Sequence, residues 1–273
     1  MESFNLKYKS SQINYIRFGS GPKTVVCFHG YGEDSSGFRF LNSLSLTDYL
    51  FLAIDLPCHG RTTWNERKAF SINDLLSIVD AILAQQGIEG KLQFSVIGFS
   101  LGARVALRLY EKAPERINRL VLLAPDGMKL NFWYWLSTQT WLGNKFFRLT
   151  MKHPHWFFGF LKLLNKLGFV NTSIFKFVNA YIGNSKVRDA LYNRWTGLRD
   201  IRPNLAKIKK EIKINKTPVR LIYGRHDRII LPTRGHRFIS GIESHATLTI
   251  IDSGHQVLSP RHVSHIQKAL YGE

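Results

Sequence analysis

Short apolar runs alternate with stretches of helical periodicity along both ends of the chain. Two segments near the start alternate polar and apolar residues and predict a pair of strands, residues 4–9 and 13–19. Four later runs are apolar on both faces, as in strands buried inside a parallel sheet; they span residues 24–30, 50–57, 91–99 and 117–127. We therefore expect an α/β fold with a mostly parallel central sheet.

Helices are expected between these strands, on both faces of the sheet. The segment from Ser71 to Gly87 starts at a serine cap, carries apolar residues at spacings of three and four, and stops at glycine. Residues 35–45 and 100–116 also fit helices. Right-handed crossovers through such helices bring the strands into one parallel sheet.

The alternation breaks near Asp126 and resumes at Pro218. Residues 127–217 show helical stretches, such as residues 175–183, and no strand pattern. Beyond them the chain again reads strand, helix, strand and helix, over residues 218–227, 232–242, 246–252 and 259–270. We predict a core domain of residues 1–125 and 218–273, with a helical insertion over residues 126–217.

The insertion is strongly basic and aromatic. Residues 127–217 contain 17 Lys and Arg against 3 Asp and Glu, so they carry +14 of the net charge of +19, and they hold 17 of the 35 aromatic residues. The aromatic side chains can form the core of the insertion or line an apolar pocket. The charge is compatible with a solvated face, peripheral contact with an anionic membrane or attraction of an acidic substrate. Nucleic acid is an unfavoured partner, since no recognised binding motif is present.

Several classes of protein are disfavoured by simple features. The first residues lack the apolar run of a signal peptide and no 18-residue uncharged apolar stretch occurs, so we expect a soluble, cytoplasmic protein, peripheral membrane contact remaining open. Cys27 and Cys58 lie in a buried strand and a turn, where packing roles are expected rather than a disulfide. No metal-ligand spacing or dinucleotide-binding motif is present, and we expect no cofactor.

The segment Gly98-Phe99-Ser100-Leu101-Gly102 lies between a buried strand and a helix. Glycines on either side allow a sharp turn that lifts a serine hydroxyl above the sheet edge, where it can act as a nucleophile. The helix that follows directs its first N–H groups and positive dipole end toward the serine, which favours an oxyanion there.

A serine nucleophile needs a base, and the base needs an orienting acid. In an open α/β sheet both belong on loops after the carboxyl ends of strands, where Asp227 and His255 are found. Asp126, after another strand, is the alternative acid.

The loop "FHGYG", which follows "TVVC" at residues 24–27, offers backbone N–H groups to the same place. We expect the N–H groups of Tyr31 and Leu101 to form the oxyanion hole. His29 and Gly30 are expected to support this loop, with the imidazole bracing it rather than transferring protons.

With these residues in place, the chain resembles the α/β-hydrolase fold family, in particular its lid-bearing esterase and lipase-like serine hydrolases. The matching motifs are "HGYG" at 29–32, "DLPCHGRT" at 55–62, "GFSLG" at 98–102, "YGRHDRII" at 223–230 and "DSGHQVLSP" at 252–260. The resemblance implies that Ser100 is the nucleophile, His255 the base and Asp227 the acid, and that the insertion is the lid.

The chain departs from the family pattern in one motif and from some relatives in another. Cys58 stands where glycine is common, in a turn away from the expected chemistry. Relatives that hydrolyse epoxides or alkyl halides use aspartate where this chain has Ser100, so those two reactions are disfavoured.

We expect a hydrolase that cleaves a carboxylic ester with an apolar acyl part through an acyl-enzyme, without cofactor or metal. Thioester hydrolysis and cleavage of a carbon–carbon bond beside a carbonyl remain open, because one triad serves all three. An alternative of another class is a non-catalytic protein that binds lipid or an acidic partner through the basic insertion. The sequence carries no signal of oligomeric state.

Overall fold

The computed structural model describes residues 2–43, 48–66, 69–88, 93–129, 132–167 and 182–272. Contacts within the chain divide it into two compact units. The first unit comprises Met1–Lys129 together with Asp200–Glu273, and the second comprises Leu130–Arg199.

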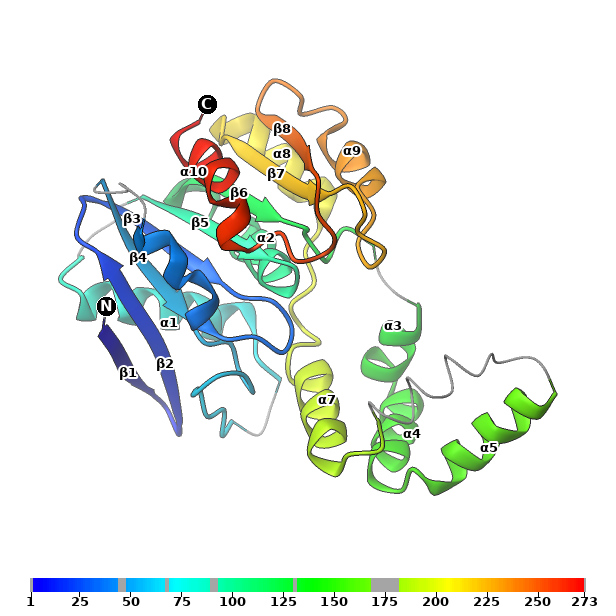
Figure 1. Ribbon diagram of the computed structural model, residues 1–273. Coiled ribbons are helices and arrows are strands. Elements are labelled where there is room, and N and C mark those ends of the chain that lie inside the picture. The colour runs from blue at the N-terminus through cyan, green and yellow to red at the C-terminus, as the bar shows by residue number, and fades with distance from the viewer. Residues whose placement is uncertain are drawn as a thin grey trace. The chain divides into compact units, whose positions relative to one another are not determined.

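The first unit is built on an eight-stranded sheet of order β1-β2-β4-β3-β5-β6-β7-β8 (Figure 1). Its strands are β1 (Glu2–Tyr8), β2 (Ser11–Gly19), β3 (Lys23–Phe28), β4 (Tyr49–Ile54), β5 (Phe94–Phe99), β6 (Ile117–Leu123), β7 (Val219–Gly224) and β8 (Ala246–Ile251). β1 and β2 run antiparallel to their neighbours, and all pairs from β4 to β8 are parallel. The prediction of a mostly parallel sheet is confirmed.

Helices cover both faces of this sheet. Phe38 and Leu41 of η1 (Ser35–Ser43) and Ile266 of α10 (Val263–Tyr271) belong to one buried cluster with side chains from one face. The other face carries α1 (Ile72–Gln85), α2 (Leu101–Lys112), α8 (Leu205–Asn215) and α9 (Thr233–Ile239). Two short 3-10 turns, η2 (Pro114–Arg116) and η3 (Pro260–His262), complete the unit. The segment expected as a helix over residues 35–45 is thus a 3-10 helix where it is described.

The start of α1 follows from its cap, as expected. The Ser71 hydroxyl accepts a hydrogen bond from the Asp74 N–H, and the Asp74 carboxylate accepts one from the Ser71 N–H. This reciprocal pair satisfies two backbone donors that a helix start leaves unpaired.

The second unit is helical throughout its described part. Its helices are α3 (Phe132–Gln139), α4 (Trp141–Lys152), α5 (His155–Lys166) and α7 (Ser185–Gly197). The helical stretch expected over residues 175–183 lies almost wholly outside the described residues.

The boundaries of the second unit are narrower than those predicted for the insertion. Residues 126–129 and 200–217 belong to the first unit. In the second of these segments, Ile208 and Ile212 on α8 are fully buried, and the helix packs against α2. The basic residues are divided accordingly: residues 130–199 contain ten Lys and Arg and a single acidic residue, while all 17 aromatic residues of the predicted insertion remain within them.

Two further findings concern the thiols and the membrane. Neither cysteine forms a disulfide; Cys27 is fully buried, which raises the pKa of its thiol, and Cys58 is half-buried in a turn at φ 62°. No helix in the described parts of the chain is long and apolar enough to cross a membrane.

Candidate active site

Ser100 forms a one-residue corner between β5, which ends at Phe99, and α2, which begins at Leu101. Its backbone has φ 49° and ψ −112°, a conformation that L-residues rarely adopt and that costs about 1–3 kcal/mol. Hydrogen bonds on both sides hold it. The Ser100 N–H donates to Leu123 O at 2.9 Å, and Ser100 O accepts from Asp126 N at 3.1 Å. The surrounding strands therefore stabilise the strained corner.

Gly102 explains why the corner needs glycine two positions after the serine. A Cβ atom on Gly102 would lie 1.9 Å from Phe28 O, at the end of β3. The first turn of α2 is thus pressed against the neighbouring strand with no room for a side chain. This close packing keeps the start of the helix, and its free N–H groups, directly beside Ser100.

The structure brings Ser100, His255 and Asp227 together. Ser100 Oγ lies 3.0 Å from His255 Nε2, and His255 Nδ1 lies 2.8 Å from Asp227 Oδ2. The three side chains come from the carboxyl ends of β5, β8 and β7. In the tautomer that fits these contacts, Nδ1–H donates to the carboxylate and Nε2 accepts a hydrogen bond from the Ser100 hydroxyl.

Asp227 is held rigidly by its own backbone turn. Its Oδ1 accepts hydrogen bonds from the N–H groups of Ile229 and Ile230, both at 2.8 Å, and its side chain is 0% exposed. Oδ2 is left to face His255. A buried carboxylate with two backbone donors stays in place as an acceptor for the imidazole.

The loops that carry the acid and the base touch each other. A Cβ on Gly224 would lie 2.0 Å from Gly254 O, and the His226 N–H donates to Ser253 O at 2.9 Å. The absence of a side chain at Gly224 therefore lets the Asp227 turn approach the His255 loop.

Asp126, the alternative acid, is engaged elsewhere. Its Oδ2 lies 3.2 Å from a guanidinium nitrogen of Arg104, and its Oδ1 accepts the Gly127 N–H at 2.7 Å. Among the described contacts it has none with His255.

The loop of residues 29–33 lies beside the corner and is braced by His29. The Leu56 N–H donates to His29 Nε2 at 3.0 Å, so Nδ1 carries the proton and donates to Gly30 O at 2.8 Å. His29 is fully buried. Both ring nitrogens are used in shaping the loop that contains Tyr31. Because Leu101 is the first residue of α2, no carbonyl group of an earlier helical turn is present to accept a hydrogen bond from its N–H.

Sequence reasoning missed one link, between Glu33 and Gln256. Glu33 Oε2 accepts the Gly30 N–H at 3.1 Å, and Glu33 Oε1 accepts from Gln256 Nε2 at 3.0 Å. Because Gln256 follows His255, this carboxylate ties the glycine loop to the histidine loop. Gln256 directly follows His255 and Glu33 lies two residues after Tyr31, but no sequence pattern connects the two.

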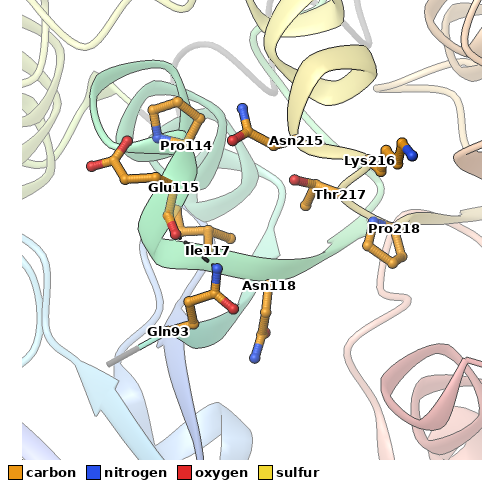
Figure 2. Close-up of a pocket in the computed structure, with 9 residues that line it drawn as sticks. All are labelled: Gln93, Pro114, Glu115, Ile117, Asn118, Asn215, Lys216, Thr217 and Pro218. Atoms are coloured by element: carbon orange, nitrogen blue, oxygen red, sulfur yellow. Dashed lines mark hydrogen bonds between the residues drawn. The ribbon is translucent and has the colours of Figure 1, made fainter. Parts of the chain in front are cut away.

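A separate pocket of about 220 Å³ lies at the amino-terminal ends of the central strands, opposite to the ends that carry the triad (Figure 2). It is lined by Gln93, Pro114, Glu115, Ile117, Asn118, Asn215, Lys216, Thr217 and Pro218. These residues surround the amino ends of β5, β6 and β7, whereas Ser100 follows the carboxyl end of β5. The pocket therefore belongs to a different site from the triad. No cluster in the described residues could hold a metal ion.

The sequence matches the family model described as "alpha/beta hydrolase fold" over residues 23–259. That range includes all five motifs except the last residue of "DSGHQVLSP".

Relatives and solved structures agree with this match. A hydrolase of Escherichia coli, named for 2-hydroxy-6-oxononadienedioate and 2-hydroxy-6-oxononatrienedioate, is 26% identical over 265 residues, covering 90% of this chain and 85% of its own. The acetyltransferase component of an acetoin-cleaving system from Cupriavidus necator is 32% identical over 117 residues, but the match covers only 42% of this chain and 30% of that protein. The structure of a probable hydrolytic enzyme from Pseudomonas aeruginosa has a TM-score of 0.70 at 19% identity, covering 98% of this chain and 94% of that one.

We predict that Gly102→Ala lowers the free energy of unfolding by about 2 kcal/mol or more, because the added methyl would overlap the Phe28 carbonyl. Gly37→Ala is the matched control, since its Cβ would meet only Leu258 at an ordinary 3.7 Å. Chemical denaturation of wild type and of the two variants measures the change in the free energy of unfolding that each substitution causes. Equal stability of Gly102→Ala and wild type would contradict the packing described for the corner.

Proposed function

This chain belongs to the alpha/beta hydrolase family and is a hydrolytic enzyme, and from that premise we propose that it cleaves carboxylic esters with an apolar acyl part. The observation that carries the proposal is the continuous hydrogen-bond chain from Ser100 Oγ through His255 to Asp227, at 3.0 and 2.8 Å. It starts on a strained corner at the carboxyl edge of the sheet, where ligands of open α/β sheets bind.

In the proposed reaction, His255 Nε2 accepts the Ser100 proton as Oγ attacks the ester carbonyl carbon. The developing oxyanion accepts hydrogen bonds from the N–H groups of Leu101 and Tyr31. His255 then returns the proton to the leaving alcohol as the acyl-enzyme forms. Water, activated by the same nitrogen, releases the acid and restores Ser100.

Asp227 acts through His255. Its Oδ2 fixes the tautomer with the proton on Nδ1 and stabilises the imidazolium that forms during attack. Since its carboxylate is buried and its other oxygen is occupied by two backbone N–H groups, it needs no rearrangement during the reaction. The free-energy cost of orienting this carboxylate is therefore met when the protein folds and does not add to the barrier of the reaction.

The preference for an apolar acyl group is supported by composition. All 17 aromatic residues of the predicted insertion lie in residues 130–199, the segment that we propose to be the lid. Small-molecule pockets are lined mainly by apolar and aromatic side chains.

Carbon–carbon bond hydrolysis is the second candidate reaction. It is favoured by the E. coli relative, whose name gives a dienedioate substrate and whose similarity extends over 90% of this chain. Water or a serine hydroxyl can add to a ketone in the same oxyanion site, so the triad alone does not separate this reaction from ester hydrolysis. Thioester hydrolysis by the same triad differs from ester hydrolysis only in the leaving group, which is a thiol instead of an alcohol.

The two candidate acids are separated by conservative substitutions. We predict that Asp227→Asn lowers kcat by about 10³–10⁴-fold, because the imidazole loses its orienting partner. Asp126→Asn removes only the pair with Arg104 and is expected to keep kcat within about tenfold of wild type. Steady-state hydrolysis of a p-nitrophenyl ester measures both variants. The assignment is wrong if Asp126→Asn is inactive and Asp227→Asn is not.

Substrate class is tested by comparing leaving groups and acyl lengths. We expect kcat/KM to rise with acyl length across a series of p-nitrophenyl esters, and to exceed the values for acyl-coenzyme A and for a vinylogous 1,5-diketone acid. All three activities should be absent in Ser100→Ala. A higher kcat/KM for the diketone would favour the carbon–carbon reaction, and no turnover of any class by folded protein would favour the non-catalytic binding role.

A further inference from the structure

The second unit carries most of the exposed apolar surface. Of the fourteen large apolar side chains that are exposed in the described chain, ten lie between residues 132 and 167. They are Phe132, Trp133, Trp141, Leu142, Phe146, Leu149, Trp156, Phe160, Leu163 and Leu167. Single exposed apolar residues are common on soluble proteins, but a cluster of this size marks an interaction surface.

Helix α4 has two apolar faces. Its inner face is buried through Thr150 and Met151, and Phe147 packs against Tyr192 and Trp195 of α7 at ring distances of 5.4 and 5.6 Å. The inner face of α4 therefore makes the contacts that hold this helix within the second unit. The outer face nevertheless carries four large apolar residues, with Trp141 and Leu142 exposed by 73% and 71%.

Basic side chains border the outer face of α4. Lys145, Arg148 and Lys152 follow one another at spacings of three and four, so they lie on one stripe of the helix. Lys145 Nζ lies 4.9 Å from the centroid of the Trp141 ring, above the ring. The stripe of positive charge is thus directly beside the exposed aromatic residues.

Helix α5 extends this surface. Trp156, Phe160, Leu163 and Leu167 recur at spacings of four, three and four, which places them on one side of the helix and its end, and all are exposed by 40% or more. The rings of Trp156 and Phe146 lie 4.9 Å apart, so the exposed residues of α4 and α5 are continuous.

We propose that this α4–α5 surface, formed by the eight exposed apolar residues of the two helices and the basic stripe of α4, binds an anionic lipid bilayer. Indole and phenyl rings enter the interface between headgroups and acyl chains, while lysine and arginine remain beside the anionic headgroups. Exposed apolar residues and a basic border are both accommodated by such a surface.

Charge argues against the other occupants. Residues 130–199 contain ten Lys and Arg against the single acidic residue Asp189. A second copy of the same surface would bring these like charges together. A neutral bilayer would leave the basic stripe without a counter-charge. An anionic bilayer instead supplies a negative surface potential that strengthens binding by about fivefold for each nearby basic side chain.

The surface is separate from the catalytic chemistry. None of its residues belongs to the Ser100, His255 and Asp227 chain, and the inference does not depend on which bond the enzyme cleaves. Ser100→Ala should therefore lose hydrolysis and keep membrane binding.

The test is co-flotation of the full-length protein with vesicles of phosphatidylcholine, with or without phosphatidylglycerol. We expect binding only to the anionic vesicles, loss of binding at high salt, and unchanged binding of Ser100→Ala. The double variant Lys145→Glu/Lys152→Glu should bind at least about thirtyfold more weakly, because loss of the two basic charges alone accounts for that factor and the added carboxylates are repelled by the anionic surface. Trp141→Ala/Phe160→Ala, at exposed positions, should also bind at least tenfold more weakly.

The matched control is Lys210→Glu/Lys213→Glu, which makes the same change of net charge on exposed positions of α8 in the first unit. It should bind within about threefold of wild type. The proposal is overturned if wild type does not bind anionic vesicles, if this control loses binding as strongly as the α4 variant, or if the aromatic variant binds as well as wild type. The last result would indicate an acidic protein partner or charge attraction alone.

Discussion

The proposed active site depends on the conformation of a single residue. Ser100 has a positive φ that its side chain disfavours, and the sheet holds it there through hydrogen bonds to Leu123 and Asp126. The corner can form only because Gly102 has no side chain to collide with Phe28 O. As a result, the Ser100 hydroxyl faces His255, and Ser100 also precedes a helix whose first, unpaired N–H groups lie beside that hydroxyl.

The remaining parts of the site are arranged around that corner by the parallel sheet. β7 and β8 end at the same edge as β5, so the loops with Asp227 and His255 reach Ser100 without long connections. Each loop is braced by contacts of its own: Asp227 by two backbone N–H groups, the His29 loop by Leu56, and the histidine loop by Gln256 and Glu33. In the proposed reaction, groups fixed in this way are already oriented before substrate arrives.

Much of this arrangement could be predicted from sequence, because it follows from local patterns. Buried strands, the glycine-flanked Ser100 and the positions of Asp227 and His255 after strands all leave short-range signals. The Glu33–Gln256 link leaves none, since it joins residues 223 positions apart. The boundary after residue 199 was also hidden: α8 has the lysine-rich composition of the predicted insertion, and the burial of Ile208 and Ile212 against the first unit is a tertiary property.

The central claim, that Ser100 is a nucleophile activated by His255, is tested most directly by covalent labelling. A fluorophosphonate should react with the wild-type protein, peptide mapping should place a single adduct on Ser100, and Ser100→Ala should stay unlabelled while His255→Ala labels far more slowly. The account is contradicted if folded protein that hydrolyses its substrate is not labelled, or if the adduct lies on a residue other than Ser100.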